Sequence, residues 1–142
     1  MNGATVKVYS LAKDGQTRPF MSNGKRCTNF TVKEFACHDG TDPVFISPTV
    51  VDIMQDVRTH YGRPVHVSNH SAYRTPSHNK REGGSAYSYH QYGRAVDFHV
   101  EGVAHTEVAA YLETRLPNTG GIGVYSWGVH VDDRKEKSRW NG

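Results

Sequence analysis

The most regular hydrophobic pattern in the chain lies between Pro48 and Tyr61. Apolar side chains recur there at helical spacing, at Val50, Ile53, Met54, Val57 and Tyr61. Ser47 is a suitable N-cap for such a helix, and Gly62 can end it in a left-handed conformation. The pattern therefore predicts an amphipathic helix over residues 48–61, with its apolar stripe in the core.

Alternating apolar and polar positions predict several short strands, because successive side chains of a strand point to opposite faces. The segments are residues 5–9, 65–68, 94–100, 122–125 and 129–132. Two further helices are predicted: a short one that begins at Thr31 with a capping box to Glu34, and one over residues 106–116 that ends before Pro117. No regular βαβ order appears. The pattern favours an α+β fold in which helices flank a small, mainly antiparallel sheet.

The segment from Asn69 to Ser88 fits neither period and is rich in Ser, Asn and Gly. Loops of this length inside compact domains are usually functional or disordered. We therefore expect this segment either to carry functional residues or to lack a fixed structure.

The length of 142 residues suits a single domain, with residues 1–29 as an N-terminal strand and polar segment and residues 30–142 as its main body. The net charge of +3 permits anionic partners, but no Lys/Arg block indicates a nucleic-acid binder. The sequence contains no apolar run of about 18 residues, so membrane insertion is not predicted. The N-terminus lacks the apolar core of a signal peptide. We expect a monomer that binds neither nucleic acid nor a bilayer.

Two cysteines, Cys27 and Cys37, leave two alternatives open. They can close a short disulfide, which a loop-entropy account values at roughly 3 kcal/mol, or they can stay reduced and partly buried, which is favoured. A metal site of Cys27, Cys37 and His38 is disfavoured further, because the spacing departs from the usual C-x(2–4)-C pattern.

Candidate chemistry centres on a histidine and an aspartate, His90 and Asp97, that stand seven residues apart. On a straight helix this spacing would separate them by about 10 Å, too far for one ion. A histidine on a loop that turns back over a strand-borne carboxylate can reach a shared metal. Alternation in the later strand places His130 and Asp132 on one face. Two histidines and one carboxylate, with a fourth position left for water, are the composition of a catalytic zinc centre.

The alternative for each of these residues is an ordinary solvated or hydrogen-bonded role, because nine histidines in one chain create many chance pairs with aspartate. We interpret most other histidines as structural or surface residues: His38, His60, His66, His78, His99 and His105. His70 is of more interest because it lies in the same loop as Arg74.

Four blocks of the sequence resemble, in the same order, the zinc D-Ala-D-Ala peptidases and related murein endopeptidases, the group that shares a core with Hedgehog signalling domains. Residues 88–97 follow the pattern S-x-H-x-x-G-x-A-x-D, and residues 71–84 follow S-x-Y-R-T-P-x-H-N with a later G-G. Residues 121–140 contain G-I-G, V-H-V-D and R-W, and residues 30–40 resemble the usual N-terminal stretch. One H-x(6)-D is a weak signature, whereas four ordered blocks over about residues 30–140 are specific.

The resemblance implies one zinc ion per chain with three ligands: His90, Asp97 and His130. It implies that Arg74 faces the site and binds a substrate carbonyl or carboxylate, a role that suits the permanent, forked guanidinium. Ser88 and Tyr89 are expected to bind substrate, to shape the loop, or to hydrogen-bond a metal ligand.

One departure concerns the general base. Several branches of this family place a catalytic glutamate or aspartate three residues before the final metal histidine, where this chain has Trp127. Asp132 is the candidate base by strand geometry, because it points to the same side as His130. The alternative is that Asp132 accepts a hydrogen bond from a ligand histidine and only orients it. The departure also leaves open that this chain does not catalyse.

The expected function is zinc-dependent hydrolysis of a peptide bond in bacterial peptidoglycan stem or cross-link peptides, by an endolysin-like murein endopeptidase or a D-Ala-D-Ala carboxypeptidase. The alternatives are a zinc-containing binding module without hydrolysis and a structural component of a virion or cell wall. We expect action at the bacterial cell wall. Because no signal peptide is seen, the expectation is a phage-encoded protein that is cytoplasmic before lysis, or export by another route.

Overall fold

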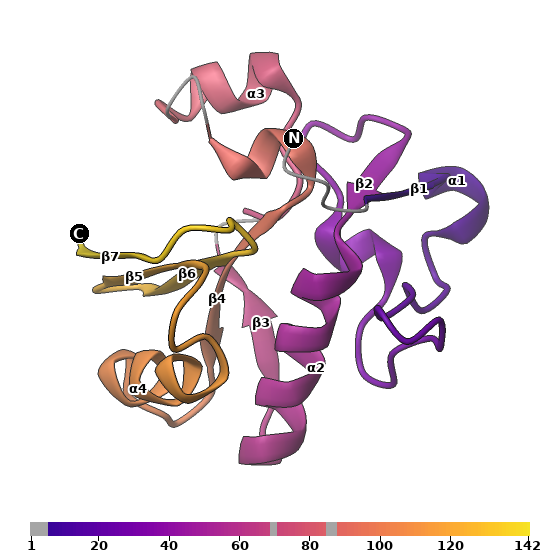
Figure 1. Ribbon diagram of the computed structural model, residues 1–142. Helices are drawn as coiled ribbons and strands as arrows, with labels where there is room; N and C mark the ends of the chain where they lie inside the picture. The colour runs from indigo at the N-terminus through magenta and orange to yellow at the C-terminus, as the bar shows by residue number, and fades with distance from the viewer. Residues whose placement is uncertain (1–5, 69–70, 85–87) are drawn as a thin grey trace.

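The computed structural model describes residues 6–68, 71–84 and 88–142, whose arrangement Figure 1 shows. The helical elements are α1 (Leu11–Asp14), α2 (Pro48–Tyr61), α3 (Pro76–Arg81), α4 (His105–Arg115) and two 3-10 turns, η1 (Val32–Phe35) and η3 (Tyr89–Tyr92). The strands are β1 (Lys7–Tyr9), β2 (Val44–Ile46), β3 (Val65–Val67), β4 (Ala95–Val100), β5 (Gly121–Tyr125), β6 (Gly128–Asp132) and β7 (Ser138–Asn141). The chain thus forms a small single-domain α+β fold, as predicted.

The main sheet has five strands in the order β3-β4-β6-β5-β7. All neighbours pair antiparallel except β7, which runs parallel to β5. The mainly antiparallel sheet is therefore confirmed, although β7 was not predicted because its sequence does not alternate. Tertiary contacts hold it: the Arg139 guanidinium donates to the carbonyl oxygens of Leu116 and Gly120.

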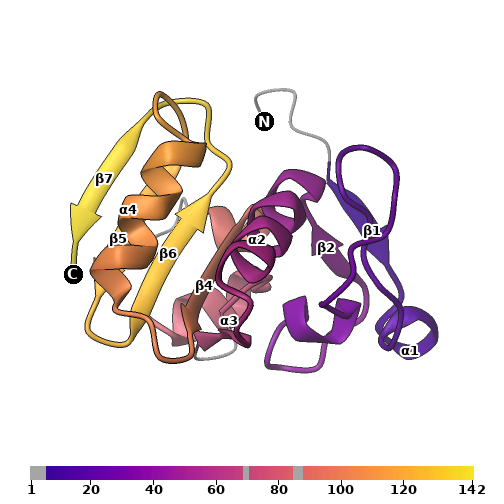
Figure 2. The same ribbon diagram turned by 90° about the horizontal axis from the view of Figure 1, so that it is seen from below.

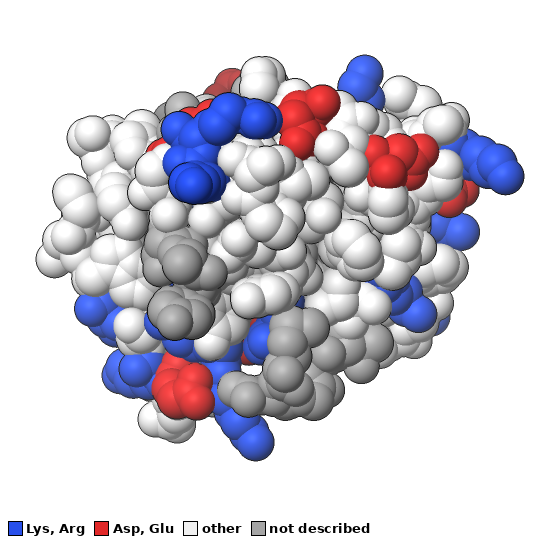
Figure 3. Space-filling view, turned by 90° about the horizontal axis from the view of Figure 1, so that it is seen from above, with Lys and Arg blue, Asp and Glu red and all other residues white. Residues whose placement is uncertain are grey.

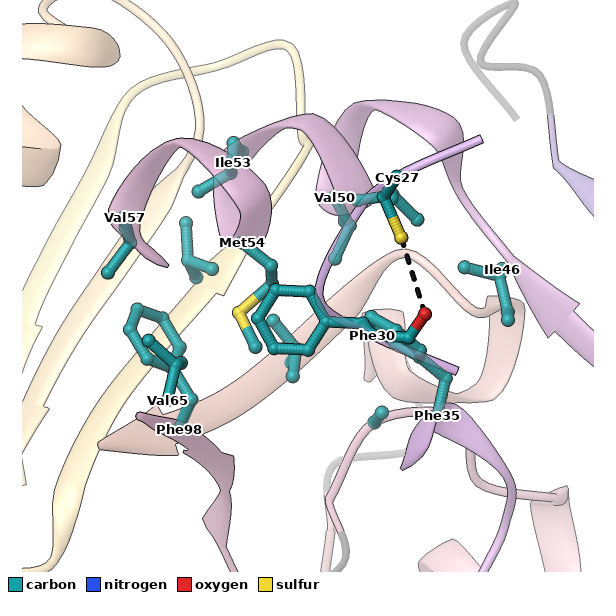
Figure 4. Close-up of a cluster of buried hydrophobic side chains, with 14 of the residues drawn as sticks. Cys27, Phe30, Phe35, Ile46, Val50, Ile53, Met54, Val57, Val65 and Phe98 are labelled. Atoms are coloured by element: carbon teal, nitrogen blue, oxygen red, sulfur yellow. Dashed lines mark hydrogen bonds between the residues drawn. The ribbon is translucent and has the colours of Figure 1, made fainter. Parts of the chain in front are cut away.

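The core lies between the sheet and α2. This helix has the predicted bounds, and Ser47 caps it by accepting a hydrogen bond from the Val50 N–H. In Figure 4 its apolar stripe faces Val65 and Phe98, from neighbouring strands of the sheet. Helix α4 lies beside α2 on the same side of the sheet and contacts β4, β5 and β6 (Figure 2). Neither α2 nor α4 covers the opposite face of the sheet.

The N-terminal segment packs onto the same core. Strand β1 pairs antiparallel with β2, and the side chains of Tyr9 and Cys27 are buried in the core cluster. The capping box between Thr31 and Glu34 is present as predicted, but it begins only the 3-10 turn η1.

Both cysteines are buried free thiols, so the reduced alternative holds. Cys27 Sγ lies 3.4 Å from the carbonyl oxygen of Phe30, to which it donates a hydrogen bond (Figure 4). Cys37 Sγ instead accepts a hydrogen bond from the N–H of Thr75, at 3.4 Å. The two thiols thus have different partners.

Part of the segment predicted as a long loop is helical. Helix α3 begins after Thr75, whose side chain accepts a hydrogen bond from the His78 N–H, and Pro76 occupies its first turn. A polar helix of six residues has no apolar stripe that periodicity can detect. Residues 69–70 and 85–87 of the segment, and with them His70, lie outside the described residues.

No helix in the described ranges is long and apolar enough to cross a membrane. Figure 3 views the molecule from the side on which α3 lies. On this face basic and acidic side chains are interspersed around a largely uncharged middle, so the visible surface carries charges of both signs.

Candidate metal centre

Two of the predicted ligands lie directly opposite each other in the sheet. The antiparallel register of β4 and β6 pairs Asp97 with His130. Val96 and Val131, the flanking pair, belong to the apolar core, so alternation turns the Asp97–His130 pair to the other face of the sheet. There His130 Nδ1 lies 2.8 Å from Asp97 Oδ1.

The third predicted ligand, His90, comes from the 3-10 turn η3. Ser88 caps this turn, its hydroxyl accepting a hydrogen bond from the His90 N–H at 3.2 Å. His90 Nδ1 donates to the carbonyl oxygen of Ala72 at 2.7 Å, which directs Nε2 toward Asp97 Oδ1, 3.3 Å away. The structure therefore brings all three residues together: one ligand atom from each lies within 4.8 Å of the others.

The His130 ring is also held from its far side. Its Nε2 donates to Asp132 Oδ2 at 2.8 Å, and Asp132 also accepts hydrogen bonds from the Gly121 N–H and from the guanidinium of Arg134. Burial alone would raise the pKa of Asp132, but the hydrogen bonds from His130 and Arg134 hold it below its usual range. Asp132 is fully buried and paired, so its geometry matches the orienting alternative rather than that of a base.

Burial and hydrogen bonding also have opposite effects on the pKa values of Asp97 and His130, which face the site. Burial would raise the pKa of Asp97, but hydrogen bonds from His130 and His90 outweigh it and lower the pKa to about 2. Burial would lower the pKa of His130, but its hydrogen bonds to Asp132 and Asp97 outweigh it and raise the pKa. His90, Asp97 and His130 are between 3% and 9% exposed as whole residues, so all three are buried. A buried carboxylate that stays ionised between two imidazoles is a favourable setting for a cation.

Two glycines of β5 make room for this face. A Cβ atom at Gly121 would collide with the Asp132 carboxylate, and one at Gly123 would collide with the indole ring of Trp140. Because neither glycine has a Cβ atom, Trp140 can lie against His130, with ring centroids 5.1 Å apart. The G-I-G sequence is thus explained by close approach of side chains to the strand.

Arg74 lies at the edge of the ligand group. Its backbone N–H donates to the carbonyl oxygen of His90 at 2.9 Å, which ties it to η3. Its guanidinium donates to Asn79 Oδ1 and Ser71 Oγ, and Nη2 lies 3.6 Å from Asp97 Oδ2. The structure thus places Arg74 beside the three ligand residues.

A cavity of about 620 Å³ opens onto these groups. Its lining includes Arg74, Ser88 and Tyr89, for which a substrate-binding role was predicted. It also includes residues that sequence reasoning did not assign to a site: Glu82, Tyr125, Trp127, Arg134 and Trp140. The Tyr125 and Trp127 rings are stacked with centroids 4.6 Å apart. Arg134 and Trp140 could have been found from the sequence, because they lie in the C-terminal block of the resemblance. For Glu82 the only indication was its position in the long polar segment.

The fold and this histidine–carboxylate group define a class, proteins with a metal-ligand site on one face of a small mixed sheet. The comparison with protein families identifies the family: the one described as Peptidase M15 matches residues 27–132. The chain therefore belongs to the M15 peptidase family, the family of the zinc D-Ala-D-Ala carboxypeptidases, as the sequence resemblance predicted. No curated protein and no solved structure gave a significant match.

Proposed function

We propose that the protein is a zinc-dependent peptidase that binds one zinc ion through His90, Asp97 and His130 and hydrolyses a peptide bond of bacterial peptidoglycan. Family membership supports the metallopeptidase class. The observation that carries the proposal is the convergence of three ligand atoms within 4.8 Å at the wall of a cavity.

The donor set fits zinc. Two imidazole nitrogens and one carboxylate are a common ligand set of catalytic zinc sites. The second nitrogen of each ring is engaged, His90 Nδ1 by the Ala72 carbonyl and His130 Nε2 by Asp132, which leaves His90 Nε2 and His130 Nδ1 for the ion. Such outer hydrogen bonds fix the tautomer and orientation of ligand histidines. When bound, zinc supplies Lewis-acid chemistry that polarises a carbonyl group and acidifies water.

Arg74 is the group that stabilises negative charge on the substrate. Its guanidinium is permanently charged and held by Asn79 and Ser71 at the cavity wall. In a water-poor site, a fixed donor aimed at a developing oxyanion lowers the barrier because it needs no reorganisation during the reaction.

Glu82 is the group that accepts a proton. Among the described residues that line the cavity, the carboxylates are Asp97 and Glu82. Asp97 is committed to two histidines, and Asp132 is buried beneath His130. The Glu82 side chain is 55% exposed and can rotate toward a substrate, so it replaces Asp132 as our candidate base.

Peptidoglycan is the proposed substrate because of the cavity's side chains. Arg74 and Arg134 suit the carboxylates of stem peptides, and the aromatic rings of Tyr89, Trp127 and Trp140 offer apolar contact area. An endolysin-like endopeptidase and a D-Ala-D-Ala carboxypeptidase both fit this chemistry. The proposal includes action at the bacterial cell wall, by a phage-encoded or otherwise exported protein that works as a monomer.

The second candidate function is a zinc-containing binding or structural module without hydrolysis. It is favoured by Trp127, which stands where several related peptidases have a catalytic carboxylate and is 37% exposed at the cavity. Digestion of purified peptidoglycan followed by mass spectrometry of the muropeptides separates the two. New amino termini or released D-alanine support the peptidase, and unchanged muropeptides with zinc bound support the module.

A further inference from the structure

We propose that the chain has a second metal site, formed by Cys37, Asp39 and His78 and separate from the site described above. One ligand atom from each of these three residues lies within 4.8 Å of the other two. This group, called here the Cys–Asp–His cluster, shares no residue with the His–Asp–His cluster of His90, Asp97 and His130. The sequence analysis did not group these three residues, and it interpreted His78 as a structural or surface residue.

Hydrogen bonds at the start of α3 bring the cluster together. The N–H of Thr75 donates to Cys37 Sγ at 3.4 Å, and the Thr75 hydroxyl donates to Asp39 Oδ2 at 2.8 Å. The Thr75 hydroxyl also accepts from the N–H of His78, one turn into α3. One threonine therefore aligns the loop after η1 with the first turn of α3, and all three side chains gather beside it.

The ligand chemistry suits zinc or a similar borderline ion. A thiolate, a carboxylate and a neutral imidazole carry two negative charges, which balance a divalent cation. A thiolate disfavours calcium and magnesium, which take oxygen ligands. Cys37 and His78 are buried, whereas Asp39 is exposed and a cavity of about 530 Å³ reaches Cys37 from the surface, so an ion has access. The fourth position is left for water.

The surroundings of the His78 ring favour binding through Nδ1. Nε2 lies 3.4 Å from Glu82 Oε1, so Nε2–H can donate to that carboxylate while Nδ1 faces the ion. Nδ1 now lies 3.4 Å from Arg81 Nη2. Arg81 is exposed and can turn away, but its charge opposes a cation there. Arg81→Gln should therefore bind the ion at least as tightly as the parent protein.

Cobalt(II) is the probe that tests this site, because only a cobalt–thiolate bond gives an intense near-ultraviolet charge-transfer band. The reduced, metal-free protein is titrated with cobalt and followed by absorption. We expect this band in the parent protein, in Arg81→Gln and in Cys27→Ser, whose buried thiol is the matched control. Cys37→Ser should abolish the band, and His78→Gln should raise the cobalt concentration needed for it.

Further measurements keep the result independent of the proposed function. His130→Ala removes a ligand of the other cluster, so it should keep the charge-transfer band even if the protein is no peptidase. Circular dichroism checks that Cys37→Ser is folded. A folded parent protein that shows no band at saturating cobalt overturns the second site, and a band that survives in Cys37→Ser but disappears in Cys27→Ser overturns the ligand assignment.

Discussion

The His–Asp–His and Cys–Asp–His clusters differ in how the chain holds them. Two ligands of the first cluster are cross-strand partners in adjacent strands of the main sheet, and both of its imidazoles donate to an acceptor behind them. The second cluster joins the loop after a 3-10 turn to a helix of six residues, and its Asp39 is exposed. The first is therefore held by regular strand pairing, whereas the second is held by the hydrogen bonds that Thr75 makes between a loop and a short helix.

The surroundings differ as well. The first cluster opens onto a cavity that contains Arg74, Glu82 and several aromatic rings, which are groups that can bind and change a peptide. The cavity that reaches Cys37 is lined mainly by the N-terminal helix and by the loop around η1. We infer that the first cluster serves chemistry and that the second fastens α3, and with it the segment of Arg74.

The largest effect is expected from His130→Ala. Two ligands remain, so the zinc of the first cluster should be lost and muropeptide hydrolysis should fall to the detection limit. Elemental analysis and amine release measure the two quantities. His66→Ala is the control, because His66 lies on the edge strand β3 with a side chain that is 48% exposed. Full hydrolysis by His130→Ala would remove the first cluster from the mechanism.

Glu82→Gln should have the next largest effect. If Glu82 accepts the proton, turnover should fall by about 10²–10⁴-fold while the zinc of the first cluster is retained. Glu101→Gln is a matched control: its side chain is 57% exposed, against 55% for Glu82, and both pair with a histidine. Turnover close to that of the parent protein would exclude Glu82 as the base.

Whether a residue of the fold or of the site could be predicted from the sequence depends on whether it lies on a regular helix or strand. Residues on regular elements were found from the sequence: the α2 stripe by its spacing, and the face shared by His130 and Asp132 by strand alternation. Strand β7 could not be found, because its position depends on pairing with β5 and on Arg139.

Contacts between distant parts of the chain were also invisible in the sequence. Cys37 and His78 meet only because Thr75 joins their two segments. Glu82 reaches the cavity because α3 ends beside it, and α3 was too short and polar to be predicted. The sequence placed Asp132 on the correct face of its strand. It could not show that Asp132 is buried and accepts five hydrogen bonds from His130, Gly121 and Arg134, because these residues meet only in the folded sheet.

Arg74→Lys tests the cationic group at the cavity wall. An ammonium group cannot reproduce the forked contacts with Asn79 and Ser71, so turnover should fall by about 10²-fold while zinc content stays constant. Arg115→Lys is the control, because its side chain is 56% exposed and pairs with Asp56 far from the site. A parent-like turnover would show that Arg74 acts only on the fold.

Asp132→Asn separates orientation from proton transfer. If Asp132 only orients His130, the change should weaken zinc binding by about 10–100-fold and should lower activity only as far as zinc is lost. Competition with a chelating dye measures the affinity, and excess zinc should restore hydrolysis. Lost hydrolysis at full zinc occupancy would instead return Asp132 to the list of candidate bases.

Trp127→Ala should have the smallest effect, and it tests whether substrate contacts the part of the cavity wall formed by Tyr125 and Trp127. The Trp127 ring stacks on Tyr125 and is 37% exposed at the cavity that the first cluster shares. If it contacts substrate, its removal should raise KM by roughly two- to tenfold, equivalent to the 0.5–1.5 kcal/mol of one aromatic contact, and should leave kcat unchanged. Trp127→Phe keeps an aromatic ring and should recover most of the affinity. A parent-like KM in Trp127→Ala would move the substrate away from this wall and toward Arg134 and Tyr89, whereas a large fall in kcat would mean that the indole ring positions the reacting groups.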